Sequence, residues 1–153
     1  MGHGHVRLVD SVETPNGALA NEPVPADQVS DDEWLIVATP GLVNGCAAGD
    51  RVLVANDGTF EVVERGGNVA AHIYSPGALA DVGLIGLQQV FAELGGTVEW
   101  PTTKRFAVVT VPVAAGFRAI EEPIEAFVAD NIGTQWNYGN VYDDENSPLG
   151  WWD

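Results

Sequence analysis

The stretch NVAAHIYSPGALADVGLIGLQQVFAELGGTVEW, residues 68–100, decides the fold because the spacing of its apolar residues changes twice. The short apolar run at its start is typical of a β-strand, and helical spacing follows over residues 78–94. The apolar face of this helix comprises Leu84, Leu87, Val90, Phe91 and Leu94. Gly95 and Gly96 end the helix, and TVEW follows as a second strand. We therefore expect a strand, a helix and a strand in that order.

The residues that follow repeat this alternation. RFAVVTVPV predicts a strand joined to TVEW by the turn PTTK, and a second amphipathic helix with Pro123 in its first turn closes at Gly133. TQWNYGNVYD then predicts one more strand. The order strand, helix, strand, strand, helix, strand over residues 68–142 is that of a ferredoxin-like split βαβ sandwich. The predicted core residues are Leu84, Leu87, Phe91, Val108, Val109, Ile124 and Phe127.

Short apolar runs separated by turn residues also precede residue 68. RVLVA and TFEVVER flank Asn56, Asp57 and Gly58, and the Asp-Gly pair supplies the positive φ angles that a tight hairpin requires. Together with NVAAHIYS, these runs predict a small antiparallel three-stranded meander packed on the segment around Trp34. The predicted fold class is therefore α+β, a ferredoxin-like sandwich preceded by an antiparallel β meander.

The chain of 153 residues fits one ordinary domain with short flanking segments. Residues 10–33 carry seven acidic residues, three prolines and no basic residue. Residues 1–33 are therefore predicted to be an acidic, irregular leader. Residues 34–142 form the predicted α+β domain, and residues 143–153 form an acidic, aromatic C-terminal tail.

The chain is strongly acidic. Its 22 acidic and 6 basic residues give a formal net charge of −16 at pH 7. This charge repels nucleic acids and anionic membranes, whose binding needs clustered Lys and Arg, so we expect neither as a partner. The same field attracts basic proteins and speeds their association. A basic protein partner is one interpretation, and acidity that serves only solubility is the other.

No combination of residues in the sequence predicts catalysis. His72 and Cys46 are the histidine and the thiol of the predicted domain, and each is explained structurally, by a place in a strand or in a core. Metal-ligand spacings and phosphate-binding glycine loops are missing, so we expect no enzyme activity, no metal and no cofactor. Because Cys46 is the single cysteine and no apolar run approaches the roughly 18 residues that span a bilayer, we expect a cytoplasmic protein.

Residues 134–153, TQWNYGNVYDDENSPLGWWD, combine aromatic and acidic side chains without a basic residue. Aromatic residues anchor protein interfaces, and carboxylates pair with the Arg and Lys residues of a partner. The predicted partner-binding residues are Trp136, Tyr138, Tyr142, Asp143, Asp144, Glu145, Trp151, Trp152 and Asp153. The alternative is that Trp151 and Trp152 only cover an edge of the core.

The runs PGLVNGCAAGDRVLV and FEVVERGGNVAAHIY, with the later AVVTVP before a helix, resemble a bacterial family over about residues 34–143. This family is called domain of unknown function 4265. Its recurrent proline, Gly-x-x-x-Gly-Asp strand entry and turn residues are matched by Pro40, Gly45, Gly49, Asp50, Gly67 and Asn68. Gly66 departs from the pattern, because the family usually has serine there. The resemblance implies the fold and no activity.

These observations favour a binding protein without catalytic activity. The leading hypothesis is a cytoplasmic immunity or inhibitor protein that neutralises a basic toxin, for example a nuclease, by covering its active cleft with an acidic aromatic surface. A small-molecule sensor with a ligand between sheet and helices is the alternative, and an enzyme ranks third. A large apolar pocket with convergent polar groups would favour the sensor, whereas a shallow acidic face with exposed tryptophan would favour the inhibitor.

Overall fold

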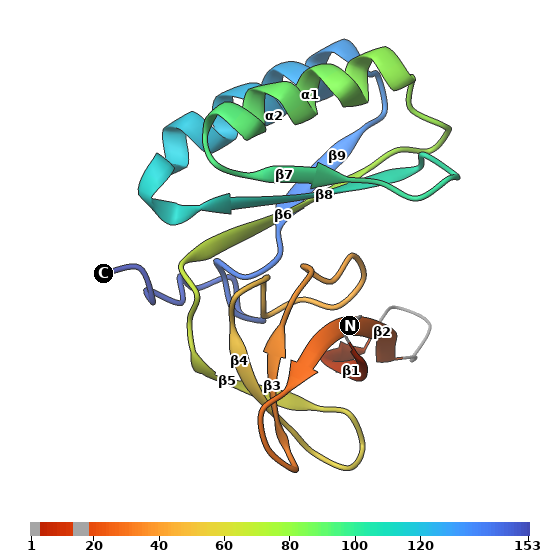
Figure 1. The fold of residues 1–153 in the computed structure, drawn as a ribbon. Coiled ribbons are helices and arrows are strands. Elements are labelled where there is room, and N and C mark those ends of the chain that lie inside the picture. The colour runs from red at the N-terminus through yellow and green to blue at the C-terminus, as the bar shows by residue number, and fades with distance from the viewer. Residues whose placement is uncertain (1–3, 14–18) are drawn as a thin grey trace. The chain divides into compact units, whose positions relative to one another are not determined.

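The protein, described here by a computed structural model, divides into two compact units with one β-sheet each (Figure 1). The structure describes residues 4–13 and 19–153. Unit 1 combines residues 1–68 with residues 139–153, and unit 2 comprises residues 69–138. The two sheets and two α-helices make the fold α+β, as the sequence predicts.

Unit 1 is built on a five-stranded antiparallel sheet in the order β1-β2-β3-β4-β5. Each strand pairs with the strand that follows it in sequence, so the sheet is a meander. Its strands are β1 (Gly4–Glu13), β2 (Leu19–Gln28), β3 (Glu33–Ile36), β4 (Arg51–Val54) and β5 (Phe60–Glu64). The predicted hairpin between β4 and β5 is confirmed, because Gly58 has a φ angle of 89° and its N–H donates to the Ala55 carbonyl at 2.9 Å.

The first two strands occupy the segment for which the sequence predicted an irregular leader. Val6 and Leu8 of β1 and Val24 and Ala26 of β2 are buried, and the residues between them are more exposed. This alternation buries one face of each strand. Burial of that face stabilises the sheet even though the exposed face carries charged residues. The composition of residues 10–33 is acidic and rich in proline, and it concealed the alternation.

The third run of the predicted meander, NVAAHIY, leaves this sheet and forms β6 (Asn68–Tyr74) of the second sheet. Gly66 and Gly67 make the departure possible. A Cβ atom on Gly66 would lie 2.4 Å from the backbone of Gly49, and Gly67 has a φ angle of 90° that favours glycine. The meander therefore ends at β5, and residues 34–142 divide between the two units instead of forming one.

Unit 2 carries a four-stranded sheet in the order β7-β8-β6-β9, with both helices on one face (Figure 1). β6 pairs with β9 and β7 pairs with β8, in both cases antiparallel. The remaining elements are α1 (Asp81–Glu93), β7 (Thr97–Glu99), β8 (Phe106–Pro112), the 3-10 turn η1 (Val113–Ala115), α2 (Phe117–Asp130) and β9 (Gln135–Tyr138). Helix α2 begins earlier than predicted, so Pro123 lies inside it and not in its first turn.

The core of unit 2 includes every residue that the sequence assigned to it. The buried residues are Leu84, Leu87, Phe91, Val108, Val109, Ile124 and Phe127. Val90 was expected on the same face of α1 but is 41% exposed, so the buried stripe of this helix is narrower than predicted. No helix in the described part of the chain is both long enough and apolar enough to cross a membrane.

Candidate functional site

The loop between β3 and β4, residues 37–50, is held in place by carboxylates of the first two strands. Glu22 of β2 accepts hydrogen bonds from the backbone N–H groups of residues 41–43, at 3.3, 2.6 and 2.9 Å. Asp10 of β1 is buried and accepts one from the N–H of Asn44 at 3.1 Å. Because hydrogen bonds to ionised groups are the stronger ones, these two carboxylates give the loop a defined conformation.

A buried ion pair lies at the end of the same loop. Asp50 is fully buried and accepts hydrogen bonds from the N–H groups of Ala47 and Gly66 at 2.9 and 2.8 Å. The guanidinium of Arg65 lies 3.5 Å from the Asp50 carboxylate and donates to the Gly45 carbonyl at 3.0 Å. Burial raises the pKa of Asp50 above its ordinary value, against the opposing effect of both N–H groups and Arg65. Arg65 therefore forms its ion pair with a residue of the same unit.

Cys46 lies beside this ion pair and is buried. Burial raises the pKa of its thiol far above the ordinary value, and the negative charge of Asp50 adds to the effect. The thiolate is the nucleophilic form of cysteine, and this thiol stays protonated at neutral pH. Cys46 accordingly contributes a small, buried, protonated side chain to the core of unit 1.

The last residues of the chain pack on unit 1 through tryptophan. The indole N–H of Trp151 donates to the carbonyl of Asn140 at 2.8 Å, and the guanidinium of Arg65 lies 5.5 Å from the centre of the Trp151 ring. Trp151 also contacts Trp152 edge to face, with ring centres 5.4 Å apart. Such cation–π and aromatic contacts are stabilising. The tail therefore shields the ion pair of Arg65.

A tight turn in the tail is shaped by Asp143. Its Oδ1 atom accepts hydrogen bonds from the backbone N–H groups of Glu145 and Ser147, at 2.9 and 2.8 Å. Two residues beyond the turn, the N–H of Leu149 donates to the carbonyl of Val141 at 2.8 Å. The turn thus fixes the Asp143 carboxylate and returns Leu149 toward the same part of unit 1.

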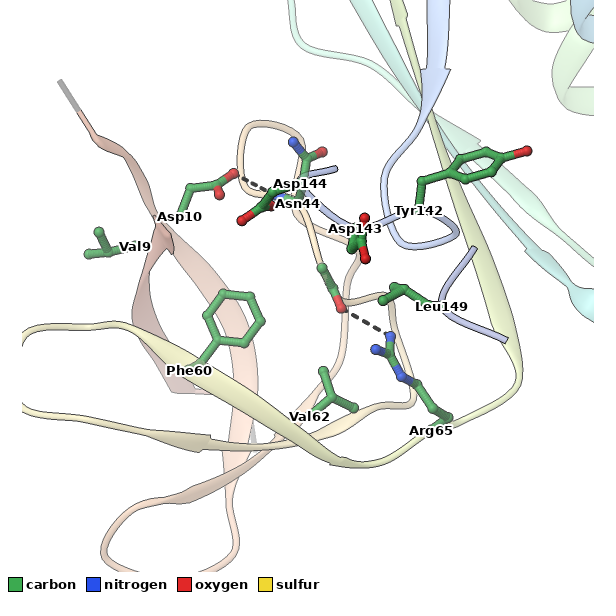
Figure 2. A pocket seen from close by; sticks show the side chains of 11 residues that line it. Val9, Asp10, Asn44, Phe60, Val62, Arg65, Tyr142, Asp143, Asp144 and Leu149 are labelled. Carbon is green, nitrogen blue, oxygen red and sulfur yellow. Dashed lines mark hydrogen bonds between the residues drawn. The ribbon is translucent and has the colours of Figure 1, made fainter. Parts of the chain in front are cut away.

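A pocket of about 260 Å³ lies between β1, β5, the β3–β4 loop and the tail, and we call it the acidic pocket (Figure 2). Its carboxylates are those of Asp10, Asp143 and Asp144. Its apolar lining consists of Val9, Phe60, Val62 and Leu149, and Asn44, Gly45, Arg65 and Tyr142 complete it. Figure 2 shows the Arg65 guanidinium directed at the Gly45 carbonyl. The acidic pocket therefore joins negative charge to an apolar surface.

The structure divides the predicted partner-binding residues between the two units. Unit 1 holds Tyr142 and the predicted residues of the tail, and of these Tyr142, Asp143 and Asp144 line the acidic pocket. Outside the pocket, Glu145 and Asp153 are exposed and the two C-terminal tryptophans are half-buried. Only part of the predicted set therefore meets in one site.

The other two predicted residues, Trp136 and Tyr138, belong to β9 in unit 2. The indole N–H of Trp136 donates to Glu125 of α2 at 3.2 Å, and the hydroxyl of Tyr138 donates to Glu121 at 2.6 Å. The two rings also contact each other edge to face, 4.9 Å apart. These side chains fasten α2 to the sheet, a structural role that the sequence analysis did not assign to them.

Several residues of the acidic pocket were not predicted from the sequence. Asp10 lies in the segment interpreted as an irregular leader. Arg65 is one of the six basic residues, to none of which the sequence analysis assigned a role. Phe60 and Val62 are two positions apart in β5, so their side chains share one face of the sheet. That alternation is the one signal in the sequence that could have indicated an apolar wall here.

The chemical groups of the acidic pocket are carboxylates and apolar side chains. In the described residues, no group of three or more His, Cys, Asp and Glu side chains is placed to hold a metal ion. The acidic pocket is lined by both carboxylates and apolar side chains. A ligand that carries positive charge on an apolar stem satisfies both parts, because amphipathic cations bury the stem while the charge stays near polar groups.

The comparisons with known proteins support the fold and the family. A crystal structure described as a hypothetical protein from Neisseria gonorrhoeae is similar to this chain with a TM-score of 0.69 and 14% identity, over 92% of this chain and 97% of that one. At this identity the likeness concerns the fold alone. No curated protein matches the sequence. The family profile described as Domain of unknown function (DUF4265) matches residues 22–134, and the chain belongs to this family.

Proposed function

We propose that this protein is a non-catalytic binding protein for a basic protein partner, and that it acts as an immunity or inhibitor protein against a toxin such as a nuclease. The observation that carries the proposal is the acidic pocket, in which Asp10, Asp143 and Asp144 stand beside an apolar lining. Interfaces obtain their affinity from such combinations of apolar contact and charged groups that match the partner's charge.

The charge of the whole chain supports the same proposal. A formal net charge of −16 draws a basic protein toward the site and repels nucleic acids and anionic lipid surfaces. A nuclease must be basic where it holds its substrate, so an acidic surface can compete for that cleft. We place the encounter in the cytoplasm, where the unpaired, buried thiol of Cys46 suits a reducing environment.

The size of the acidic pocket favours a protein partner over the alternative, a small-molecule sensor. Pockets for drug-sized ligands and cofactors measure about 300–1,000 Å³, and this pocket has a volume of about 260 Å³. One side chain fits such a space better than a metabolite of ordinary size. We further propose that unit 2 is a ferredoxin-like sandwich that serves as scaffold, supported by its strand order β7-β8-β6-β9.

The test is a titration of the full-length protein into purified basic nuclease domains of bacterial toxins, with an acidic nuclease domain as the negative control. Nuclease activity and the association rate are measured for the natural protein and for the double variant Asp143→Asn/Asp144→Asn. We expect stoichiometric loss of activity for a basic nuclease and a slower association with the double variant, because two charges of the site are removed.

The matched control is Glu93→Gln/Asp130→Asn, which removes two exposed charges from unit 2 and leaves the acidic pocket intact. This control should associate nearly as fast as the natural protein. Equal rates for the natural protein and both double variants would refute the proposed surface. Tight binding of a nucleic acid by the natural protein would refute the proposed partner class.

A further inference from the structure

We infer that the acidic pocket receives a single arginine side chain of the basic partner, an inference that rests on the proposed function and specifies its site. The lining carries out two tasks that an arginine requires. Its three carboxylates, Asp10, Asp143 and Asp144, oppose the charge of a guanidinium, and its apolar side chains cover the methylene stem.

Two of the three carboxylates are positioned by hydrogen bonds within the protein. Asp10 is held by the N–H of Asn44, and Asp143 is held by the N–H groups of Glu145 and Ser147. Asp144 follows on the exposed side of the same turn. A site whose charges are fixed in advance loses less side-chain entropy on binding, so these hydrogen bonds favour recognition.

The apolar part of the lining favours arginine over a smaller cation. Phe60 offers an aromatic ring, and Leu149 reaches the pocket from the tail (Figure 2). A planar guanidinium stacks on aromatic rings and is less strongly hydrated than an ammonium group, so it enters such a partly apolar space at a smaller cost. An inorganic cation gains nothing from this surface.

The resident Arg65 does not occupy this role itself. Its guanidinium donates to the Gly45 carbonyl and pairs with the buried carboxylate of Asp50, and the ring of Trp151 lies over it. Asp50, the carboxylate with which Arg65 pairs, is not part of the pocket lining. Although Arg65 is part of the lining, its charge is therefore matched by Asp50.

The experiment titrates the full-length, isotope-labelled protein with N-acetyl-arginine methylamide and follows the backbone amide signals by NMR. The isosteric but neutral N-acetyl-citrulline methylamide and the ammonium-bearing N-acetyl-lysine methylamide are titrated in parallel. We expect saturable shifts at Gly45, Phe60 and Leu149 with the arginine probe, weaker ones with lysine and none with citrulline.

The variant Asp144→Asn should weaken binding of the arginine probe about threefold or more, since it removes one exposed charge from the rim. The control Asp130→Asn removes an equally exposed charge from unit 2 and should leave the affinity unchanged. Absence of shifts at Gly45, Phe60 and Leu149, equal binding of citrulline, or preference for lysine would each overturn the inference.

The two proposals can fail separately. If a basic nuclease binds and is sensitive to Asp143→Asn/Asp144→Asn, yet the arginine probe leaves the pocket signals unmoved, the proposed function stands and the arginine site is refuted. If the arginine probe binds the pocket and no basic nuclease competes with it, the arginine site stands and the protein partner is refuted.

Discussion

Arg65 contacts three separate segments of unit 1. It neutralises the fully buried Asp50, donates to the Gly45 carbonyl and lies against the ring of Trp151. A buried carboxylate without a counter-charge is costly, because its charged form has lost its hydration. The free energy of unfolding should therefore depend on Arg65 more than on any exposed charge.

Replacing Arg65 with methionine keeps the bulk of the side chain and removes its charge. We expect the free energy of unfolding at pH 7 to fall by about 3 kcal/mol, since breaking a buried pair leaves an uncompensated charge. Urea denaturation of the natural protein and the variant measures this loss. The exposed Arg118, which pairs with Glu122 on α2, provides the control, because Arg118→Met should cost little.

The pH dependence of this loss follows from the direction of the pKa shift. Burial raises the pKa of Asp50 in the folded protein, so its protonated form is favoured there relative to the unfolded chain. The stability that this group contributes is present at low pH and is lost as the pH rises through its folded pKa. Without Arg65 the folded pKa rises further, so the destabilisation by Arg65→Met should shrink from pH 7 toward pH 4. An equal loss at both pH values would contradict the buried pair.

At the scale of elements, the periodic segments of unit 2 could be predicted and those of unit 1 only in part. The apolar face of α1 and the run that forms β8 follow a regular spacing over many residues, and burial of one face decides their structure. β1 and β2 were missed because acidic residues and prolines outweighed the shorter alternation of Val6, Leu8 and Val24. Amino-acid composition therefore predicts strands poorly where, as for β1 and β2, two neighbouring segments pair with each other.

The acidic pocket was harder to predict than any element. Asp10, Phe60 and Asp144 line it together, although they are far apart in the sequence. Only the tail residues stood out as a cluster of aromatic and acidic side chains, and the structure brings Tyr142, Asp143 and Asp144 of that cluster to the pocket. A site whose residues come from distant parts of the chain produces no contiguous sequence pattern from which it could be predicted.

Helix α1 provides a test of the core of unit 2. Phe91 is fully buried, whereas its neighbour Val90 is 41% exposed. Phe91→Ala should lower the free energy of unfolding by about 3–5 kcal/mol, because it removes apolar contacts and leaves a cavity. Val90→Ala, the control at the exposed edge of the buried stripe, should change it by about 0.5 kcal/mol or less. Comparable losses in thermal or urea unfolding would contradict the assignment of the buried face.

The tail offers a second test at this scale. Deleting residues 146–153 removes Trp151 and Leu149, which the structure places against Arg65 and Val141. We expect the stability of unit 1 to fall by about 2 kcal/mol or more, since a cation–π contact, a hydrogen bond and apolar area are lost together. Asp153→Asn is the control, because this residue is exposed. A deletion without effect on the melting temperature would contradict a stabilising role for the packing of the tail on unit 1.

For the molecule as a whole, the net charge of −16 predicts how the association rate with the proposed basic partner depends on salt. Raising the salt concentration from about 0.05 to 0.5 M should slow association with a basic nuclease far more than it speeds dissociation, because screening acts on the encounter. Surface plasmon resonance separates the two rates. An association rate independent of salt would show that long-range electrostatics do not speed the encounter. Contacts within the acidic pocket would then be tested by substitution alone.

The division of unit 1 into residues 1–68 and 139–153 has a consequence for biosynthesis. During translation the residues of unit 2 leave the ribosome before the tail does, and domains generally form as their residues become available. The acidic pocket needs Asp143, Asp144 and Leu149, so it cannot form before these residues have been synthesised. The strands of unit 1 that precede unit 2 in the chain are therefore made well before the residues that complete the pocket.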